Sequence, residues 1–224
     1  FLGPVFGSTN KGGSEITVPF YWNIASNMDA TLAPRVMDKR GTLYNNEFRY
    51  MGESFASDLN YDVLPTDQLT KRERTRSALR HTQNLGWGVG AAINYNAVSD
   101  DAYYRDMAGS LNDAAQKNLL QEGVLTYGDT WWSSSLRVQR YQTLQDPDAP
   151  VLPPYQRLPQ LNLAAHQVAA GANLAMSAEY VDFSHPTSVN GNRVVLYPSV
   201  SYPLIRDPAY YVTPKLGVHN TQYT

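Results

Sequence analysis

The sequence predicts an all-β fold, namely an antiparallel up-and-down transmembrane β-barrel of which this chain holds roughly half the strands. Apolar and polar residues alternate with a period of two along many segments, which is typical of strands with one face toward lipid. The connections between these segments are short and long in turn, and tyrosine and tryptophan gather near segment ends. We treat residues 1–224 as one unit, the N-terminal portion of such a barrel.

Composition permits a barrel and also leaves a soluble β-sandwich open. Sixteen Tyr and four Trp coexist with a mean hydropathy of -0.42. This is too polar for a helical membrane protein but suits a barrel, in which only alternate residues meet lipid. On composition alone, a Tyr-rich soluble sandwich is the better interpretation. The net charge of -2 with scattered Lys and Arg gives no basic footprint for nucleic acid, and the absence of Cys excludes disulfides and thiolate metal sites in this span.

The alternation defines the expected strands in order along the chain. Within residues 15–63, successive segments present an apolar face and a polar face, and the latter carries Asp29, Arg35, Glu47, Arg49, Asp58, Asn60 and Asp62. In a barrel we expect these seven residues to face the lumen. Further alternating segments lie around 89–96, 136–139, 161–166 and 174–180. Segments 76–86 and 115–128 alternate poorly and are assigned by continuity, and 113–120 fits a short helix equally well. Roughly thirteen strands are expected.

The lengths of the connections favour the barrel over the sandwich. Tight turns are expected near 25–27, 52–54, 86–88, 128–130, 169–172 and 206–209. Longer or more polar connections are expected at 65–75, 99–112, 145–159 and 185–192, preceded on the same side by short ones at 10–13 and 38–41. Tight turns on one rim and longer loops on the other are typical of outer-membrane barrels, whereas a Greek-key sandwich has no reason to separate them.

Aromatic residues near the tight turns support the same interpretation. Indole and phenol rings favour the membrane interface, where one edge is apolar and the other can hydrogen-bond to water. The residues expected there are Tyr21, Trp22, Trp87, Trp131 and Trp132. Taken singly, each ring also fits the core of a soluble sheet.

The two ends of the sequence indicate a fragment of a longer protein. The chain opens on a strand-like run, Phe1 to Ser8, without a signal peptide, and stops within another, Tyr210 to Tyr223. Its longest apolar runs fall far short of the ~18 residues that suggest a membrane-spanning helix.

Residues 18–50 carry a family resemblance. The stretches "PFYWNIASNMDATLAPR" and "RGTLYNNEFRY" closely resemble the opening strands of the lipopolysaccharide-assembly outer-membrane protein family. "LNYDVLPTD" resembles the family as well. Beyond about Thr66 the resemblance depends mainly on strand spacing and on fragments such as "INYNAVSDDAYYRDM". It therefore spans the chain but is most specific over the first third.

The resemblance implies a bacterial outer-membrane location and a very large barrel of about two dozen strands. It implies lipopolysaccharide and outer-membrane lipids as partners, together with a plug lipoprotein inside the barrel. It also implies a periplasmic bridge protein, which would dock on a jelly-roll domain outside this chain. The implied activity is transport, with no enzymatic function, no cofactor and no metal.

Two prolines, Pro4 and Pro19, match positions to which the resembling family assigns a role in transport. Pro4 and Pro19 fall in the first two expected strands, and proline has no N–H to donate to a sheet ladder. By itself each marks a strand end or a bulge. In the resembling family, prolines at the matching positions weaken the pairing of the first and last strands. That seam is a lateral gate through which lipid A leaves while the saccharide passes through the lumen. Pro34, Pro198, Pro203 and Pro214 also fall in expected strands and suggest further bulges.

Three other function classes are weighed against transport. A solute-conducting porin shares the alternation and the loop asymmetry but lacks the resemblance over residues 21–35. A soluble all-β carbohydrate-binding module fits the composition. An outer-membrane lipase is the weakest, because no catalytic constellation can be assembled and the four His are isolated in sequence.

Overall fold

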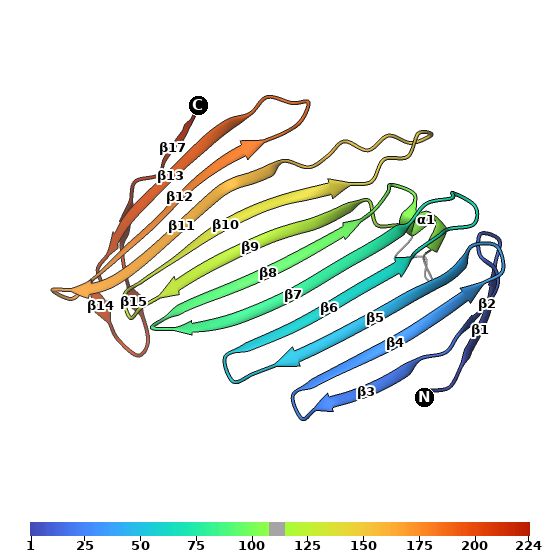
Figure 1. The fold of residues 1–224 in the computed structure, drawn as a ribbon. Coiled ribbons are helices and arrows are strands. Elements are labelled where there is room, and N and C mark those ends of the chain that lie inside the picture. The colour runs from blue at the N-terminus through green and yellow to red at the C-terminus, as the bar shows by residue number, and fades with distance from the viewer. Residues whose placement is uncertain (108–114) are drawn as a thin grey trace. The chain divides into compact units, whose positions relative to one another are not determined.

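The computed structural model describes residues 1–107 and 115–224, which form strands and one short helix (Figure 1). The elements are β1 (Val5–Thr9), β2 (Gly13–Thr17), β3 (Phe20–Ala25), β4 (Met28–Met37), β5 (Gly41–Met51), β6 (Phe55–Leu64), β7 (Arg74–Gly86), β8 (Val89–Val98), α1 (Tyr103–Met107), β9 (Asn118–Gly128), β10 (Trp132–Thr143), β11 (Gln156–Ala169), β12 (Ala172–Ser184), β13 (Gly191–Ser201), β14 (Ile205–Arg206), β15 (Tyr211–Val212), β16 (Lys215–Gly217) and β17 (Asn220–Tyr223).

Strands that follow one another in sequence are neighbours in space, which confirms the up-and-down prediction. Within the described part of the chain, fifteen strands form one antiparallel sheet. Its path runs from β1 through β2 and β4 to β13 and then β16, with β3 paired to β4 and β17 paired to β13. The short strands β14 and β15 form a separate two-stranded ribbon. In this chain β1 is an edge strand.

The structure has more strands than the thirteen expected, partly because Pro19 divides one of them. Ile16 lies opposite Val36 and Phe20 lies opposite Leu32, so β2 and β3 keep a single register along β4. The poorly alternating segments are strands, β7 and β9. The alternative of a helix at 113–120 is wrong for its described part, which contains a turn at residue 115 and the start of β9. Residues 113 and 114 lie outside the described part.

The tight turns occur where they were expected, and two have the backbone of a type I′ hairpin. Trp87 and Gly88 between β7 and β8 have φ of 48° and 78°, and Ala170 and Gly171 between β11 and β12 have φ of 49° and 81°. Positive φ at both central residues matches the right-handed twist of the flanking strands. At Gly88 a Cβ would lie 2.1 Å from the Gly128 carbonyl oxygen, so this position requires glycine.

The chain divides into two compact units. Unit 1 consists of Phe1–Gln83, Ala92–Glu122 and Tyr141–Pro154, and unit 2 consists of Asn84–Ala91, Gly123–Arg140 and Tyr155–Thr224. The candidate functional site lies entirely in unit 1.

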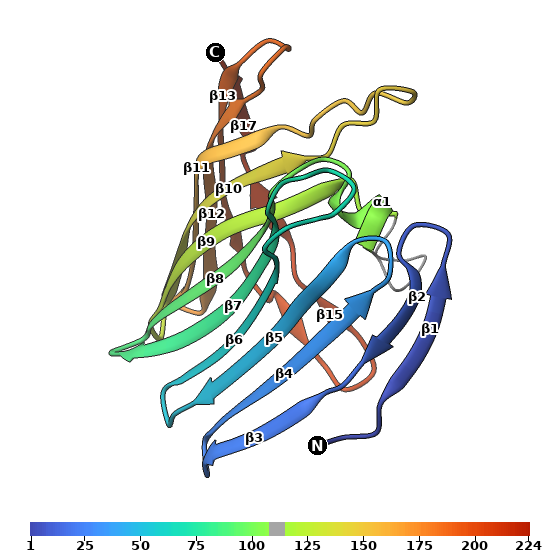
Figure 2. The ribbon, with the colours of Figure 1, turned by 45° about the vertical axis from the view of Figure 1, so that its right-hand side comes forward.

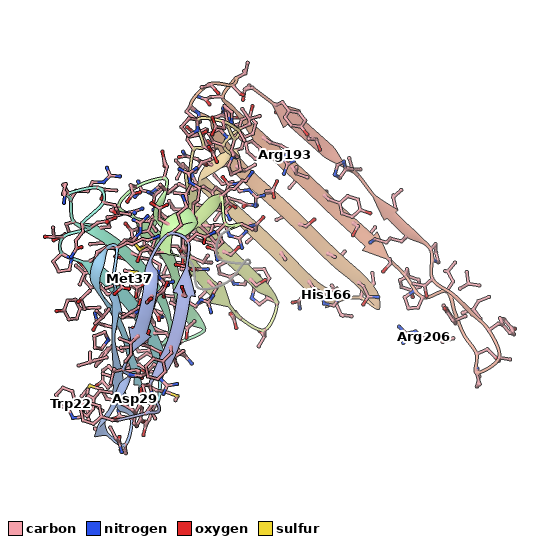
Figure 3. The ribbon with its side chains drawn as sticks, turned by 90° about the vertical axis from the view of Figure 1, so that its right-hand side faces the viewer. Trp22, Asp29, Met37, His166, Arg193 and Arg206 are labelled. Atoms are coloured by element: carbon pink, nitrogen blue, oxygen red, sulfur yellow. The ribbon has the colours of Figure 1, made fainter. Side chains whose placement is uncertain are left out.

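Register defines two faces of the sheet in unit 1. Residues directly opposite in an antiparallel pair share a face, so Asp29, Arg49 and Asp58 lie side by side across β4, β5 and β6. We call this the inner face, and α1 packs against it. The opposite, outer face exposes the apolar side chains of Leu32, Val36, Tyr44, Leu59 and Tyr61. Figure 3 shows Asp29 and Trp22 near the turn between β3 and β4, and Met37 toward the other end of β4.

Unit 2 has the same two-faced construction. Leu136, Leu161, Tyr180 and Val194 lie opposite one another in a row across β10 to β13, and all four are exposed. An exposed apolar row of this kind has no place in a soluble sandwich, whose apolar faces meet in a core. The alternation therefore describes a wall between an apolar and a polar environment.

Candidate functional site

The helix α1 lies against the inner face at the end of unit 1 where the longer connections are (Figure 1). It begins after Asp100, whose carboxylate accepts a hydrogen bond from the Ala102 backbone N–H at 3.1 Å and so caps the chain before the helix. Its buried side chains, Tyr103, Tyr104 and Met107, join an apolar cluster with the sheet residues Met37, Leu43, Leu64, Val98, Leu119 and Leu144. The described residues that follow β8, up to the end of α1, thus fold back over the inner face.

A buried ion-pair network adjoins this apolar cluster. The guanidinium of Arg74, at the start of β7, is fully buried and contacts Asp100 at 2.7 Å, Asp106 at 2.9 Å and Asp67 at 3.2 Å. Arg40 contacts Asp67 at 2.6 Å and Asp106 at 3.3 Å. The Arg74 guanidinium also lies over the Tyr103 ring, 5.7 Å from its centroid. Buried charges are tolerated only when they are paired, so this network fixes three connections and α1 in one arrangement.

The charges also set the protonation of the loop carboxylates. Burial acts to raise the pKa of Asp67, but the Leu69 backbone N–H and the guanidiniums of Arg74 and Arg40 outweigh it and lower the pKa. Burial also acts to raise the pKa of Asp100, but the hydrogen bonds from Arg74 and Ser99 outweigh it, so this pKa is lowered as well. Both carboxylates are therefore ionised at neutral pH. Burial raises the pKa of the Tyr103 hydroxyl, which stays protonated.

Two contacts connect α1 to the hairpin of β1 and β2 (Figure 2). Arg35 on β4 donates from Nε to the Glu15 carboxylate on β2 at 2.6 Å and from Nη1 to the Met107 backbone carbonyl at 2.9 Å. Lys11, in the turn between β1 and β2, lies 3.7 Å from Asp106. One end of the first hairpin is thus held by the same segment that covers the inner face.

The first hairpin is weakly paired at its other end. The Val18 N–H donates to the Pro34 carbonyl on β4 at 3.1 Å, so the next residue, Pro19, directs its backbone toward β1. Its carbonyl there accepts from the Leu2 N–H at 2.9 Å, but proline has no N–H to return. The missing donor of Pro19 therefore lies in the β1–β2 ladder.

Pro4 lies where the regular β1–β2 ladder ends. The register that pairs Val5 with Thr17 would place Gly3 opposite Pro19, yet the hydrogen bond to the Pro19 carbonyl comes from Leu2. A one-residue irregularity therefore occurs at Gly3–Pro4. Both prolines stand at strand ends rather than inside strands, as the strand-end interpretation predicts.

The seven residues predicted to face the lumen all lie on the inner face. Arg49 forms a two-pronged ion pair with Asp29 at 2.8 and 3.0 Å, and Asp62 pairs with Arg76 at 2.6 Å. Glu47 lies opposite Asn60. Charges of both signs thus neighbour one another along this face. The lumen itself remains a prediction.

The aromatic residues predicted at the membrane interface do not all share a face. Trp22 lies opposite Ala30 on the outer face, and 52% of it is exposed. Its neighbour Tyr21 lies on the inner face, where its hydroxyl donates to Asp29 at 3.4 Å. Tyr21 and Trp22 therefore lie on opposite faces, because successive residues of a strand alternate, and their place at a membrane interface stays a prediction.

The other three aromatic residues belong to unit 2. Trp87 occupies the tip of its hairpin turn and is 95% exposed. Trp131 precedes β10, and Trp132 begins it with its ring 4.6 Å from that of Tyr127. Their place at tight turns agrees with the expectation, and the membrane interface itself stays a prediction.

Sequence reasoning missed the network around Arg74. Arg40 lies between β4 and β5, Asp67 lies between β6 and β7, Arg74 begins β7 and Asp106 lies in α1, and each on its own is an ordinary charged residue near a strand end. The one signal in the sequence is Tyr103–Tyr104 followed by Met107, an apolar group inside an otherwise polar connection. No helix in the described ranges has both the length and the apolar character needed to cross a bilayer.

Comparison with known proteins gives consistent matches. The family model LptD, described as LPS transport system D, matches residues 72–224. Proteins named LPS-assembly protein LptD are similar along the chain: that of Nitrosospira multiformis is 44% identical over 231 residues, covering 100% of this chain and 25% of the relative. That of Azoarcus sp. is 45% identical, covering 99% and 28%, and that of Aromatoleum aromaticum is 46% identical, covering 100% and 28%. The chain thus spans about a quarter of the length of these curated relatives.

Among solved structures, Pseudomonas aeruginosa OccK5 (OpdH) aligns with 100% of this chain and 72% of its own, with a TM-score of 0.37 and 10% identity. At that level the likeness supports no argument about fold or function.

Proposed function

The chain belongs to the LptD family, LPS transport system D, and on that premise we propose that the whole protein inserts lipopolysaccharide into the outer leaflet of the outer membrane. This chain supplies the N-terminal part of the barrel wall. The two-faced sheet supports the proposal: its apolar face suits lipid, and its inner face, with paired charges of both signs, suits a hydrated passage for saccharide.

The proposed exit is a lateral gate at β1, where the first and last strands of the whole barrel would meet. Lipopolysaccharide has a large polar head and an apolar tail, so it cannot leave a closed barrel sideways unless some strand pairing opens. The observation that supports the gate is the weak ladder of the first hairpin. It runs only from Val5–Thr17 to Thr9–Gly13 and ends at two prolines, whereas the β4–β5 ladder runs from Met28–Tyr50 to Met37–Gly41.

The further partners belong to the same proposal. A plug lipoprotein would occupy the lumen and contact the inner face, and a periplasmic bridge protein would deliver lipopolysaccharide to a domain outside this chain. The mixed charges of Asp29, Arg49 and Asp58 provide donors and acceptors for such a plug or for the passing saccharide.

The gate is tested by restoring the missing backbone donors. A full-length P4A/P19A double variant regains two N–H groups, each contributing about 1 kcal/mol of net pairing. A total of about 2 kcal/mol would shift the open–closed equilibrium by about thirtyfold toward closed. We expect slower appearance of newly made lipopolysaccharide at the cell surface, measured by labelling of intact cells.

The matched control is P198A, which restores a donor in β13, a strand of unit 2 that does not pair with the first hairpin. It should leave surface delivery at the wild-type rate. An unchanged rate in the folded double variant would count against the gate.

A further inference from the structure

The contacts of Arg35 place one side chain between the first hairpin and α1. Arg35 is largely buried, as is its partner Glu15, and their carboxylate–guanidinium contact lies on the inner face. The other arm of the same guanidinium holds the Met107 carbonyl at the end of α1. Arg35 therefore satisfies the carboxylate of the hairpin and the last turn of the helix at the same time.

A second connection joins the same two elements at the turn of the hairpin. Arg40 donates to the Lys11 backbone carbonyl at 3.1 Å and contacts Asp106 of α1 at 3.3 Å. The Lys11 ammonium lies 3.7 Å from the same Asp106 carboxylate. The two connections use different groups: Arg35 on β4 joins Glu15 of β2 to the Met107 backbone carbonyl, whereas Arg40, in the turn after β4, joins the Lys11 carbonyl to the Asp106 carboxylate.

The remaining contacts of α1 are with the rest of unit 1. Tyr103, Tyr104 and Met107 pack on strands β4 to β6 and β8 to β10, and Arg74 binds Asp106 from β7. The helix is thus fixed to the sheet through its apolar side chains and to the hairpin through its polar groups. Displacement of α1 would leave Arg35 without the Met107 carbonyl and Lys11 without the Asp106 carboxylate, while Arg35 would keep its ion pair with Glu15.

We infer that α1 is a latch on the first hairpin, with Arg35 and Asp106 as the positioning residues that couple the two. While α1 lies on the inner face, β1 and β2 are held at their turn. When α1 leaves, the hairpin loses these contacts and keeps only its hydrogen bonds and ion pair with β4 and the turn after it, so it opens more readily. The consequence for transport rests on the proposed function: a saccharide moving along the inner face would displace α1 and so free the gate strand. The coupling itself does not depend on which molecule is transported.

The test asks whether a change at the Tyr103 side chain of α1 alters the opening of the first hairpin. Tyr103 packs near Leu64, Asp62 and Arg74, so Y103A loosens α1 without altering any contact of Arg35 or Lys11. Amide hydrogen exchange is measured on the full-length protein in detergent. The latch predicts exchange about tenfold faster or more in residues 6–16 of the hairpin as well as in α1.

The reciprocal variant, E15Q, alters the hairpin and should accelerate exchange in residues 102–107. R49M is the matched control, because it removes an inner-face arginine whose recorded ion pairs are with Asp29 and Glu47. It should change neither segment. Y103F, which keeps the ring, should behave like the wild type.

Exchange that changes only in α1 for folded Y103A, with E15Q affecting only the hairpin, would overturn the latch. Should Y103A not fold, E15Q and D106N still decide the question, because both leave the apolar packing intact. The outcome is separable from that of the gate test: coupled exchange with normal delivery in P4A/P19A would retain the latch and reject the gate.

Discussion

Replacement of Arg74 by methionine is the sharpest test of how α1 is held. Burial of Tyr103, Tyr104 and Met107 contributes about 5–9 kcal/mol at roughly 1.5–3 kcal/mol for each side chain. Ordering the five residues of the helix costs about 5–10 kcal/mol at roughly 1–2 kcal/mol for each residue. These two quantities nearly cancel, so the ion pairs of Arg74 decide whether α1 stays on the sheet.

The size of the effect follows from the partners that remain. In R74M, Asp67 keeps Arg40 at 2.6 Å, but the cation that remains for Asp100 is Arg72, which is 3.5 Å away and exposed. Removing one partner from a buried ion pair costs about 3–5 kcal/mol, and the residual pairing places R74M near the lower value. A loss of about 3 kcal/mol corresponds to exchange of the α1 amides more than a hundredfold faster than in the wild type.

The assay is amide hydrogen exchange on the full-length protein, read in residues 102–107. R49M again serves as the control, because its ion pair with Asp29 is half exposed and screened by water. Wild-type protection of α1 in folded R74M would refute the reasoning, since packing alone would then hold the helix.

Three further predictions concern pH, turn geometry and the two faces. The pKa values of Asp67 and Asp100 are lowered in the folded protein. The stability that these two carboxylates contribute is therefore present above the ordinary aspartate pKa of about 3.9 and is lost as pH falls through the lowered values. Hydrogen exchange of the α1 amides, corrected for the intrinsic rate, should be constant from about pH 5 to 8 and rise only below about 4. G88A should reduce the folded, heat-modifiable fraction on gels, since its Cβ would meet the Gly128 carbonyl, whereas G123A, with open space around it, should not. L59R on the outer face should cost about 2–4 kcal/mol in urea-dependent folding into vesicles, while N60R on the inner face should cost clearly less; equal costs would contradict the assignment of faces.

The faces and turns could be predicted because they are local. A period of two assigns Asp29 and Arg49 to one side of their strands whatever the strands later pair with. The turn at Trp87–Gly88 is fixed by glycines that accept positive φ. In both cases a few adjacent residues contain all the information. The agreement extends even to Pro19, because β2 and β3 keep one register on either side of it.

The network could not be predicted because it is not local. Arg40 and Asp67 are 27 residues apart, and Arg74 and Asp106 are 32 apart. Each pairing depends on how three connections close over the same rim, which no sequence spacing records.

The choice of charges rather than apolar residues around Arg74 bears on how α1 works. Apolar packing tolerates substitution and small shifts, whereas three carboxylates from two connections can all reach one guanidinium in few arrangements. The network therefore selects one position for α1. In a hydrated passage the same charged groups can exchange their partners for water or for the donors and acceptors of a saccharide. The free energy of that exchange is far lower than the free energy of exposing a fully apolar contact surface to water. This combination suits a segment that must be well positioned and also able to leave. Tyr103 and Met107 stabilise α1 on the sheet by apolar packing, whereas the ion pairs of Arg74 fix its position and can be replaced by other polar partners when it leaves.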